Sequence, residues 1–378
     1  MLFHNLLTHL TQVEPGKLHY RQMNKELLDL YTDYLISSFG ATTATGLSKL
    51  LDGRVSHDQI TRLLAGKPQG SADLWQLLKP QVRKMQSDEG VMIIDDSIEE
   101  KPYTDENDIV CWHYDHSKDR LVKGINFLTA LYHSQGMSLP VGFTLIAKTE
   151  QYVDKQDGKT KRRSPVTKNE HARQMLKQAV VNQIPFNYVL TDVWFASAEN
   201  MVFIKQDLQK DFVMPIKVNR KVALSLDDKR QGKYVRVDRL VFADHTPKQV
   251  YLKGVPFPLL LVKQVFTNDD GSTGVLYLVT SDTTLTFDDI TALYQKRWNV
   301  ERFHQSLKQN ASLAKSPTQT VITQTNHFVA ALCAFVKLEL LKSTTRLNHF
   351  ALKTKLYVTA LHSAFAQLHE LQPISFAA

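Results

Sequence analysis

Hydrophobic residues recur at helical spacing through the first 85 residues of the chain. In KELLDLYTDYLISSF (25–39) the apolar positions fall three or four residues apart. In TTATGLSKLLDGRVSHDQITRLLAG (42–66) the pattern predicts a helix that ends near Leu51 and a turn through Asp52, Gly53 and Arg54. A second helix begins after Ser56, whose hydroxyl suits an N-cap. The segment is therefore predicted to form a helix-turn-helix.

This helix pair admits two interpretations. As a DNA-binding unit it offers His57, Gln59, Thr61 and Arg62 to a groove or to phosphates. As an ordinary structural element it is a pair of short helices joined by a glycine turn, which is common in proteins.

From residue 91 onward the pattern indicates strands. VMIIDD (91–96) is a short apolar run that ends in two acids, and VKGINFLTALYHS (122–134) and MSLPVGFTLIAK (137–148) predict two further strands with a turn at Gly136. Thr167 and Glu170 form a capping box for a helix to about residue 181, and NYVLTD (187–192) predicts another buried strand. The order of three strands, a helix and a strand predicts an α/β layer arrangement.

A second group of strands follows at residues 211–281. Its runs are short and β-rich, and Asn268 to Gly271 predict a hairpin turn. A long helix is then expected from about 286 to 308, and a helical region from about 322 to 370. We expect five segments: a helical region with the helix-turn-helix at 1–85, a first core part at 86–210, a β-rich insertion at 211–283, a second core part at 284–325, and a C-terminal helical region at 326–378.

Composition limits the class of protein. The chain has 378 residues, of which 43% are hydrophobic, and a formal net charge of +8. This charge suits a densely anionic partner, although many soluble proteins are basic. Cys111 and Cys333 are the two cysteines, so neither a disulfide framework nor a cysteine zinc site is expected. The first residues lack the pattern of a signal peptide, and the most apolar segment is interrupted by Lys337 and Glu339. We expect a cytoplasmic protein without membrane spans.

Carboxylates follow two predicted strands. Asp95 and Asp96 end VMII, and Asp192 ends YVLT. Hard cations such as Mg²⁺ bind carboxylate oxygens, so acids at neighbouring strand ends predict a metal site. The ordinary alternative for each acid is the capping of a turn.

The predicted helix after the insertion carries a polar stripe. At about 100° per residue, Tyr294, Arg297, Glu301 and Lys308 fall within about 60° of one another. The apolar residues of the helix form a separate face, consisting of Leu293, Val300, Phe303 and Leu307. The alternative is a surface helix with an ordinary Arg297–Glu301 ion pair.

These motifs resemble those of a known family. The spacing Tyr294-x2-Arg297-x3-Glu301-x6-Lys308 is similar to the Y-R-E-K signature of DDE transposases from bacterial insertion sequences of the insertion-sequence-four type. VMIIDDS and YVLTDVWFASAE resemble the first and second Asp motifs of that family. The resemblance covers roughly residues 85–340.

The resemblance implies a fold and a metal site. The expected fold is α/β, with a ribonuclease-H-like catalytic core, a β-rich insertion and helical N- and C-terminal regions. Asp96, Asp192 and Glu301 are the implied ligands of Mg²⁺, for which Mn²⁺ would substitute. Asp96 takes the first position because Ser97 follows it, as in the family motif. Asp95 and Asp96 point to opposite faces of a strand, so one of them alone is expected in the site.

The resemblance also implies a function. A transposase would bind the terminal inverted repeats of a mobile element, cleave them by phosphoryl transfer through a DNA hairpin, and join them to target DNA, as a homodimer on DNA. Tyr294, Arg297 and Lys308 would hold phosphates near the bend. The alternatives are a ribonuclease-H-like nuclease without strand joining and a DNA-binding regulator.

Further residues are candidates for DNA contact. Trp298 is expected either to stack on a displaced base or to fill the core, and Trp194 and Phe195 are expected to pack. The polar segment 151–166 predicts a basic loop whose Lys161, Arg162 and Arg163 suit a phosphate track or simply a solvated loop. His113, Asp115 and His116 are expected to be loop or DNA-contacting residues, and a weaker set of cations lies in the insertion: Lys217, Arg220, Lys221, Lys229, Arg230 and Arg236.

Overall fold

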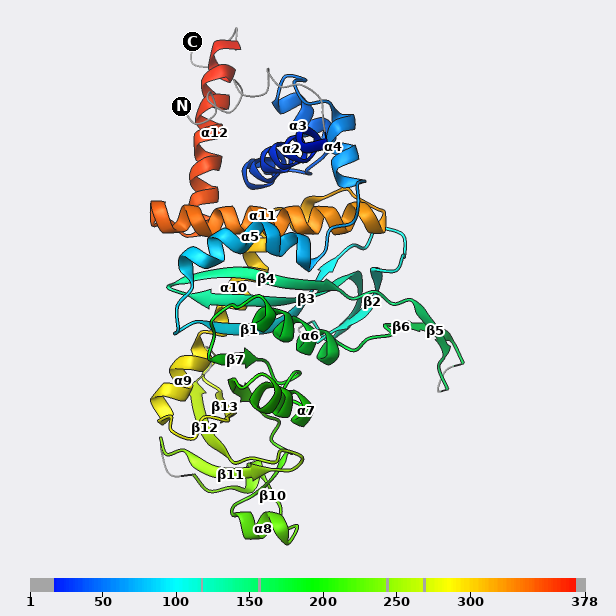
Figure 1. The fold of residues 1–378 in the computed structure, drawn as a ribbon. Coiled ribbons are helices and arrows are strands. Elements are labelled where there is room, and N and C mark those ends of the chain that lie inside the picture. Colours follow the sequence, from blue (N-terminus) through cyan, green and yellow to red (C-terminus); the bar gives the residue numbers. More distant parts are fainter. Residues whose placement is uncertain (1–16, 117, 156–157, 243–244, 268–269, 372–378) are drawn as a thin grey trace. The chain divides into compact units, whose positions relative to one another are not determined.

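The computed structural model describes residues 17–116, 118–155, 158–242, 245–267 and 270–371 (Figure 1). The chain divides into two compact units. One consists of Met1–Pro68 with Ser306–Ala378, and the other is Gln69–Gln305. No helix in the described ranges is long and apolar enough to cross a bilayer.

The sheet of the second unit has five core strands. β1 (Val91–Glu100) pairs antiparallel with β3 (Arg120–Ser134), which pairs antiparallel with β4 (Met137–Leu145). On its other side β1 runs parallel to β7 (Tyr188–Thr191), and β7 runs parallel to β8 (Asp211–Pro215). The order β4-β3-β1-β7-β8 is that of a ribonuclease-H-like core, so the predicted fold class is confirmed. β2 (Val110–Asp115) adds to the outer half of β3.

Apolar runs place β1 and β7 at the centre of this sheet. The four residues of β1 from Val91 to Ile94 are completely buried, as are Val189 and Leu190 of β7. Such continuous apolar runs are typical of strands covered on both faces. α5 (Ser71–Met85) packs against β4, and α6 (Lys168–Val181) contacts β3 and β4. The predicted capping box of Thr167 and Glu170 opens α6.

The insertion continues the same sheet. β13 (Thr273–Thr280) pairs antiparallel with β8, and β12 (Leu259–Thr267), β11 (Lys248–Leu252), β9 (Lys221–Ala223) and β10 (Val235–Arg236) follow in order. The predicted turn at 268–271 lies partly outside the described residues. Helical elements in or before the insertion are α7 (Ala198–Val202), a π-helical turn η2 (Phe203–Asp207), α8 (Leu226–Arg230) and a 3-10 turn η3 (Val237–Arg239).

The polar segment 151–166 is a hairpin, so the prediction of a loop was wrong. β5 (Glu150–Val153) pairs with β6 (Thr160–Arg163), and the resulting two-stranded arm extends away from the core sheet in Figure 1. Its pairing escapes sequence analysis because its strands are short, mostly polar, and show no alternation of apolar and polar positions.

Helices make up the first unit. α2 (Lys17–Ser37) packs on α11 (Val321–Thr345), where the Tyr31 hydroxyl lies 3.0 Å from Nδ1 of His327. α3 (Ala44–Leu50) and α4 (His57–Leu64) form the predicted helix-turn-helix, with Ser56 as N-cap. A short turn η4 (Leu313–Lys315) precedes α11, and α12 (His349–Leu371) closes the described chain.

Candidate metal centre

Two acids emerge side by side from the parallel strands. Ile94 of β1 is in register with Thr191 of β7, so Asp95 and Asp192 are the next residues of adjacent strands. Both therefore lie at the carboxyl edge of the parallel pair, where open α/β sheets bind ligands. The juxtaposition that the two apolar runs predicted is present.

Asp95 is a buried acid among other charged side chains. The residue is 8% exposed, and its Oδ1 accepts a hydrogen bond from the backbone N–H of Asp96 at 2.9 Å. Burial raises the pKa of Asp95 well above its usual value, and the nearby carboxylates of Asp192, Asp96 and Glu301 raise it further. A buried carboxylate among three others needs positive charge if it is to ionise.

Asp96 has different partners. Its Oδ2 accepts hydrogen bonds from Asn126 Nδ2 at 2.9 Å and from Lys168 Nζ at 2.6 Å, at the start of α6. Neighbouring residues of a strand point to opposite faces, which explains the separation from Asp95. Asp96 is nevertheless close enough to raise the pKa of Asp192, for which burial is the larger cause.

Asp192 also closes a turn. Its Oδ1 accepts from the backbone N–H groups of Trp194 at 3.0 Å and Phe195 at 3.3 Å. These bonds lower the pKa of Asp192 and oppose the rise caused by burial. The turn-capping alternative is therefore present here, and the capped carboxylate still lies near enough to Asp95 to raise the pKa of Asp95.

The expected long helix is broken, so the prediction of one continuous helix from 286 to 308 was wrong. α9 spans Phe287–Gln295 and α10 spans Trp298–Gln309. Between them, Arg297 N bonds to Tyr294 O and Asn299 N bonds to Lys296 O, a tighter i to i−3 pattern. The Asn299 side chain also donates to Lys296 O at 2.8 Å. This side-chain bond uses Lys296 O, which a continuous helix would offer to Val300 N, and Val300 N bonds to Arg297 O instead.

Arg297 lies at this break and reaches two acids. Its Nη1 lies 3.1 Å from Glu301 Oε1 and 3.6 Å from Asp95 Oδ2. Burial lowers the pKa of Arg297, but Tyr294, Asp95 and Glu301 outweigh it and the pKa is raised. The Arg297–Glu301 ion pair of the surface-helix alternative is therefore present. Arg297 is only 9% exposed, however, and it also contacts Asp95 on β1.

A histidine that the sequence did not predict joins the cluster. His304 lies one turn after Glu301 on α10, and Asp95, Glu301 and His304 each offer a ligand atom within 4.8 Å of the others. The ring packs against Phe127 and Phe303, and its Nε2 lies 3.5 Å from the Thr129 hydroxyl. The signal in the sequence was the i, i+3 spacing of Glu301 and His304, which places both on one side of a helix.

This donor set fits a divalent cation. Carboxylate oxygens are the ligands that Mg²⁺ and Mn²⁺ prefer, and Glu301 keeps 48% of its side chain exposed for exchange with water and ligand. The pKa values of Asp95 and Asp192 are raised mainly by burial and further by repulsion from neighbouring carboxylates. A bound cation would relieve that repulsion.

Of the other residues of the predicted stripe, Tyr294 stays beside Arg297, whose guanidinium carbon lies 5.6 Å from its ring centroid. Tyr294 belongs to α9, is 7% exposed, and has a pKa raised to about 12, mainly by burial. Trp298 is 59% exposed, with the Arg297 guanidinium carbon 5.2 Å from its ring centroid, so it does not fill the core. Lys308 lies in the last turn of α10, within the segment that belongs to the first unit.

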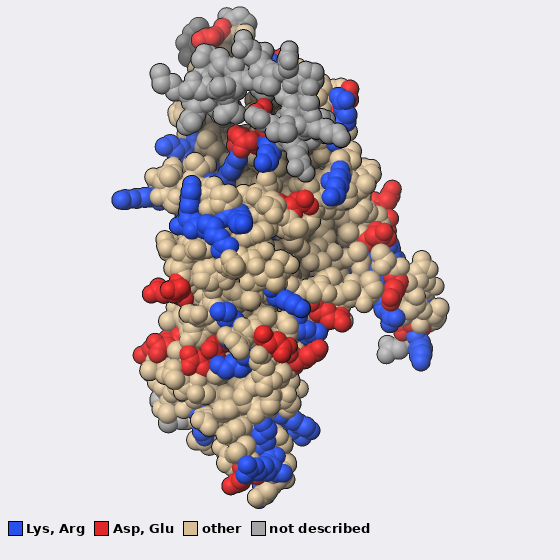
Figure 2. All heavy atoms as spheres, viewed as in Figure 1, with Lys and Arg blue, Asp and Glu red and all other residues tan. Residues whose placement is uncertain are grey.

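The predicted basic residues are mostly paired. In the β5–β6 arm, Lys161 contacts Asp154, Arg162 contacts Asp108 at 2.9 Å, and Arg163 contacts Glu150 at 2.9 Å. Figure 2 shows both signs of charge on this arm and Lys and Arg side chains gathered at the end of the insertion near α8. In the helix-turn-helix, Arg62 is exposed, whereas Gln59 completes the capping box and is not available to a groove.

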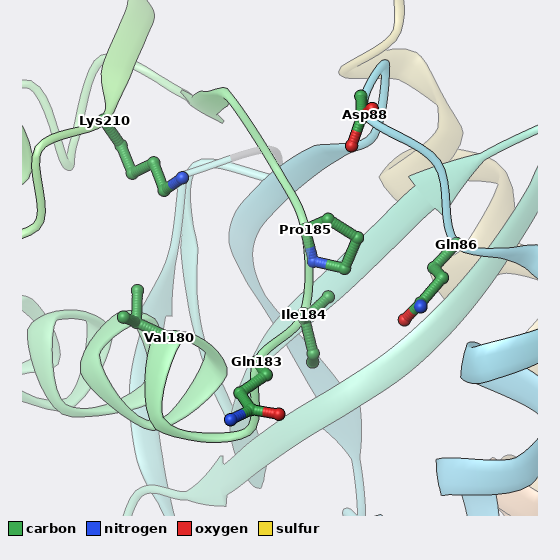
Figure 3. A pocket seen from close by; sticks show the side chains of 7 residues that line it. All are labelled: Gln86, Asp88, Val180, Gln183, Ile184, Pro185 and Lys210. Atoms are coloured by element: carbon green, nitrogen blue, oxygen red, sulfur yellow. The ribbon is translucent and has the colours of Figure 1, made fainter.

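A hollow of about 420 Å³ lies elsewhere in this unit (Figure 3). Its lining residues precede β1, belong to the end of α6 or the segment between α6 and β7, or precede β8, namely Gln86, Asp88, Val180, Gln183, Ile184, Pro185 and Lys210. It therefore lies at the amino ends of the parallel strands, opposite the carboxylates. One acid and one lysine do not make a metal or phosphate site there.

Comparisons with known proteins identify the family of the chain. Residues 6–241 match the family model described as DDE superfamily endonuclease, and residues 153–336 match the one described as transposase DDE domain. No curated protein matches the chain. Among solved structures, the Drosophila P element transposase strand transfer complex is similar at 10% identity and a TM-score of 0.24. The match covers 50% of this chain and spans 36% of the length of that one.

Proposed function

Because the chain belongs to the DDE superfamily endonucleases, we propose that it is a transposase of the insertion-sequence-four type that cuts and rejoins DNA. The observation that carries the proposal is the convergence of the Asp95, Asp192 and Glu301 carboxylates around Arg297. Phosphoryl transfer at such a site needs positioning and electrostatic stabilisation rather than a protein nucleophile.

We propose Asp95, Asp192 and Glu301 as the metal ligands, with His304 beside them. Asp96 is the alternative at the first position, because its place before Ser97 resembles the family motif. The contacts support Asp95, which shares a cluster with Glu301, whereas Asp96 already accepts from Asn126 and Lys168. Bound Mg²⁺, or Mn²⁺ in its place, would activate the attacking oxygen and stabilise the leaving oxygen at phosphorus.

The residues of the chain itself would bind and orient the DNA. Arg297 offers a planar fork to a phosphate while it holds the side chains of Asp95 and Glu301. Lys168, which contacts Asp96, places a second cation near the acids. The Y-R-E-K resemblance suggests a hairpin intermediate, in which Tyr294 and Lys308 would also hold phosphates and exposed Trp298 would stack on a displaced base.

Two further features support binding to element ends as a dimer. The helix-turn-helix leaves the Arg62 side chain exposed on α4 for a phosphate of the inverted repeat. Of the residues of α12 that the structure describes, His349, Leu352 and Lys353 are buried, and its large apolar side chains after Lys355 are exposed. A second copy would cover that apolar side, so we propose a homodimer on DNA.

Replacement of Glu301 by Gln tests the proposal. The variant keeps the size of the side chain and loses the charge of a ligand, so we expect unchanged binding of end DNA and no Mg²⁺-dependent cleavage. Arg302→Ala, which alters an exposed neighbour on α10, is the control and should cleave normally. Full cleavage by Glu301→Gln would refute the site. Incubation of the protein with pre-cut end DNA and target DNA distinguishes a transposase from a nuclease. A transposase joins the pre-cut end to the target, whereas a nuclease leaves that end unjoined.

A further inference from the structure

Trp194 is exposed beside the carboxylates, contrary to the expectation that it packs. It is 52% exposed, whereas the next residue, Phe195, is 1% exposed and fills the core as predicted. The backbone N–H of Trp194 donates to Asp192 at 3.0 Å, so the indole begins two residues from a proposed ligand. A single exposed ring is ordinary, so what matters is which side chains surround this indole.

Two further rings continue from this indole. The His116 ring centroid lies 5.8 Å from that of Trp194, and the Tyr114 centroid lies 4.9 Å from that of His116. Tyr114 is 47% exposed and projects from β2, where it alternates with buried His113. We call these three side chains the aromatic track. Tyr114 and His116 come from one segment at the end of β2 and Trp194 comes from a second, distant one, and the two segments meet at the surface.

A cation accompanies the aromatic track. Lys168 Nζ lies 6.0 Å from the Trp194 ring centroid and also contacts Asp96 at 2.6 Å. The same ammonium group thus borders both the rings and the acids. Exposed rings beside a cation match the chemistry of a nucleic acid strand, whose bases stack and whose phosphates carry negative charge.

We propose that Trp194, His116 and Tyr114 form a stacking platform for unpaired nucleobases of the DNA strand held at the carboxylates. The inference rests on the proposed function, because it takes DNA to be the substrate. Paired bases in a duplex do not expose their faces, so the platform acts on single-stranded extensions or on bases displaced near the cut. It is separate from Trp298, whose ring lies against Arg297.

The test compares two DNA probes of the same duplex, one blunt and one with a single-stranded extension that contains 2-aminopurine. Stacking on an aromatic side chain contributes about 1–3 kcal/mol per base, so Trp194→Ala should weaken binding of the extended probe by about tenfold. Binding of the blunt probe should stay within about twofold. The extension's fluorescence should be quenched by the unaltered protein and recover with the variant.

Two matched variants control the measurement. Trp194→Phe keeps a stacking face and should restore most of the binding. Tyr103→Ala removes an aromatic side chain that is 98% exposed and lies outside the track, and should have no effect. Equal loss on both probes, or no loss on either, would overturn the platform.

The result also separates the platform from the proposed function. If Glu301→Gln abolishes cleavage while Trp194→Ala binds the extended probe normally, the platform fails and the transposase proposal stands. If Trp194→Ala selectively weakens the extended probe but the unaltered protein shows no metal-dependent cleavage, the platform stands and the enzyme proposal fails.

Discussion

The guanidinium of Arg297 lies 3.6 Å from the carboxylate of Asp95, and both side chains are almost completely buried. The contact joins the break between α9 and α10 to the central strand β1. It therefore fixes the start of the helix that presents Glu301 to the strand acids.

Removal of Arg297 should destabilise the protein. Arg297→Ala leaves Asp95 buried without its cation, and loss of one partner of a buried pair costs about 3–5 kcal/mol. Glu301, the other partner of Arg297, is partly exposed and loses less. We therefore expect the free energy of unfolding, measured with urea, to fall by about 2–4 kcal/mol. The double variant Arg297→Ala, Asp95→Asn should recover a large part of that loss. Equal stability of the single and double variants would contradict the coupling.

Divalent cations should stabilise the protein in a pH-dependent way. The folded-state pKa values of Asp95 and Asp192 are raised, so their contribution to stability is fully present below the unfolded value of about 3.8 and is lost as pH rises through the folded values. We expect Mg²⁺ to raise Tm at neutral pH and to have little effect at acid pH. Thermal melts with and without Mg²⁺, from acid to neutral pH, measure this change in Tm. An increase in Tm confined to acid pH would argue against the site.

The two neighbouring acids of β1 should differ in metal binding. Asp95→Asn should raise the Tm of the metal-free protein by about 2 °C or more, because it removes a buried charge and the repulsion from its acidic neighbours, and should abolish the rise caused by Mg²⁺. Asp96→Asn should retain the Mg²⁺ effect at least in part. The reverse pattern would assign the first position to Asp96.

The Arg297 fork should matter most at the hairpin step. Arg297→Lys keeps a charge but loses bidentate contact with phosphate, so hairpin formation and opening should slow more than the first nick. The cleavage rate on intact end DNA measures the first nick, and the rate on nicked end DNA measures hairpin formation and opening. Equal slowing of the two steps would show that Arg297 acts only by holding the acids.

The exposed side of α12 should mediate dimer formation. At helical spacing Tyr357, Leu361, Phe365 and Leu368 share one side, and each is at least 44% exposed. Phe365→Asp should shift the mass measured by light scattering with end DNA from two copies to one. Thr359→Asp, on the opposite side of α12, should leave it unchanged.

Local sequence patterns determined much of the fold. Apolar runs predicted β1, β3, β4 and β7, and the side chains of Ser56 and Thr167 predicted the starts of α4 and α6, because caps and periodicity act within a few residues. The spacing of acids and the Tyr294 to Lys308 motif indicated the family.

The tertiary structure decided the rest. The expected helix breaks where the Asn299 side chain bonds to Lys296 O, and the pleat of β1 sends Asp95 toward Glu301 and His304 while Asp96 meets Lys168. The exposure of Trp194 and its approach to His116 depend on how separate segments meet. Burial and charge coupling arise between residues distant in sequence, so no local pattern contains them.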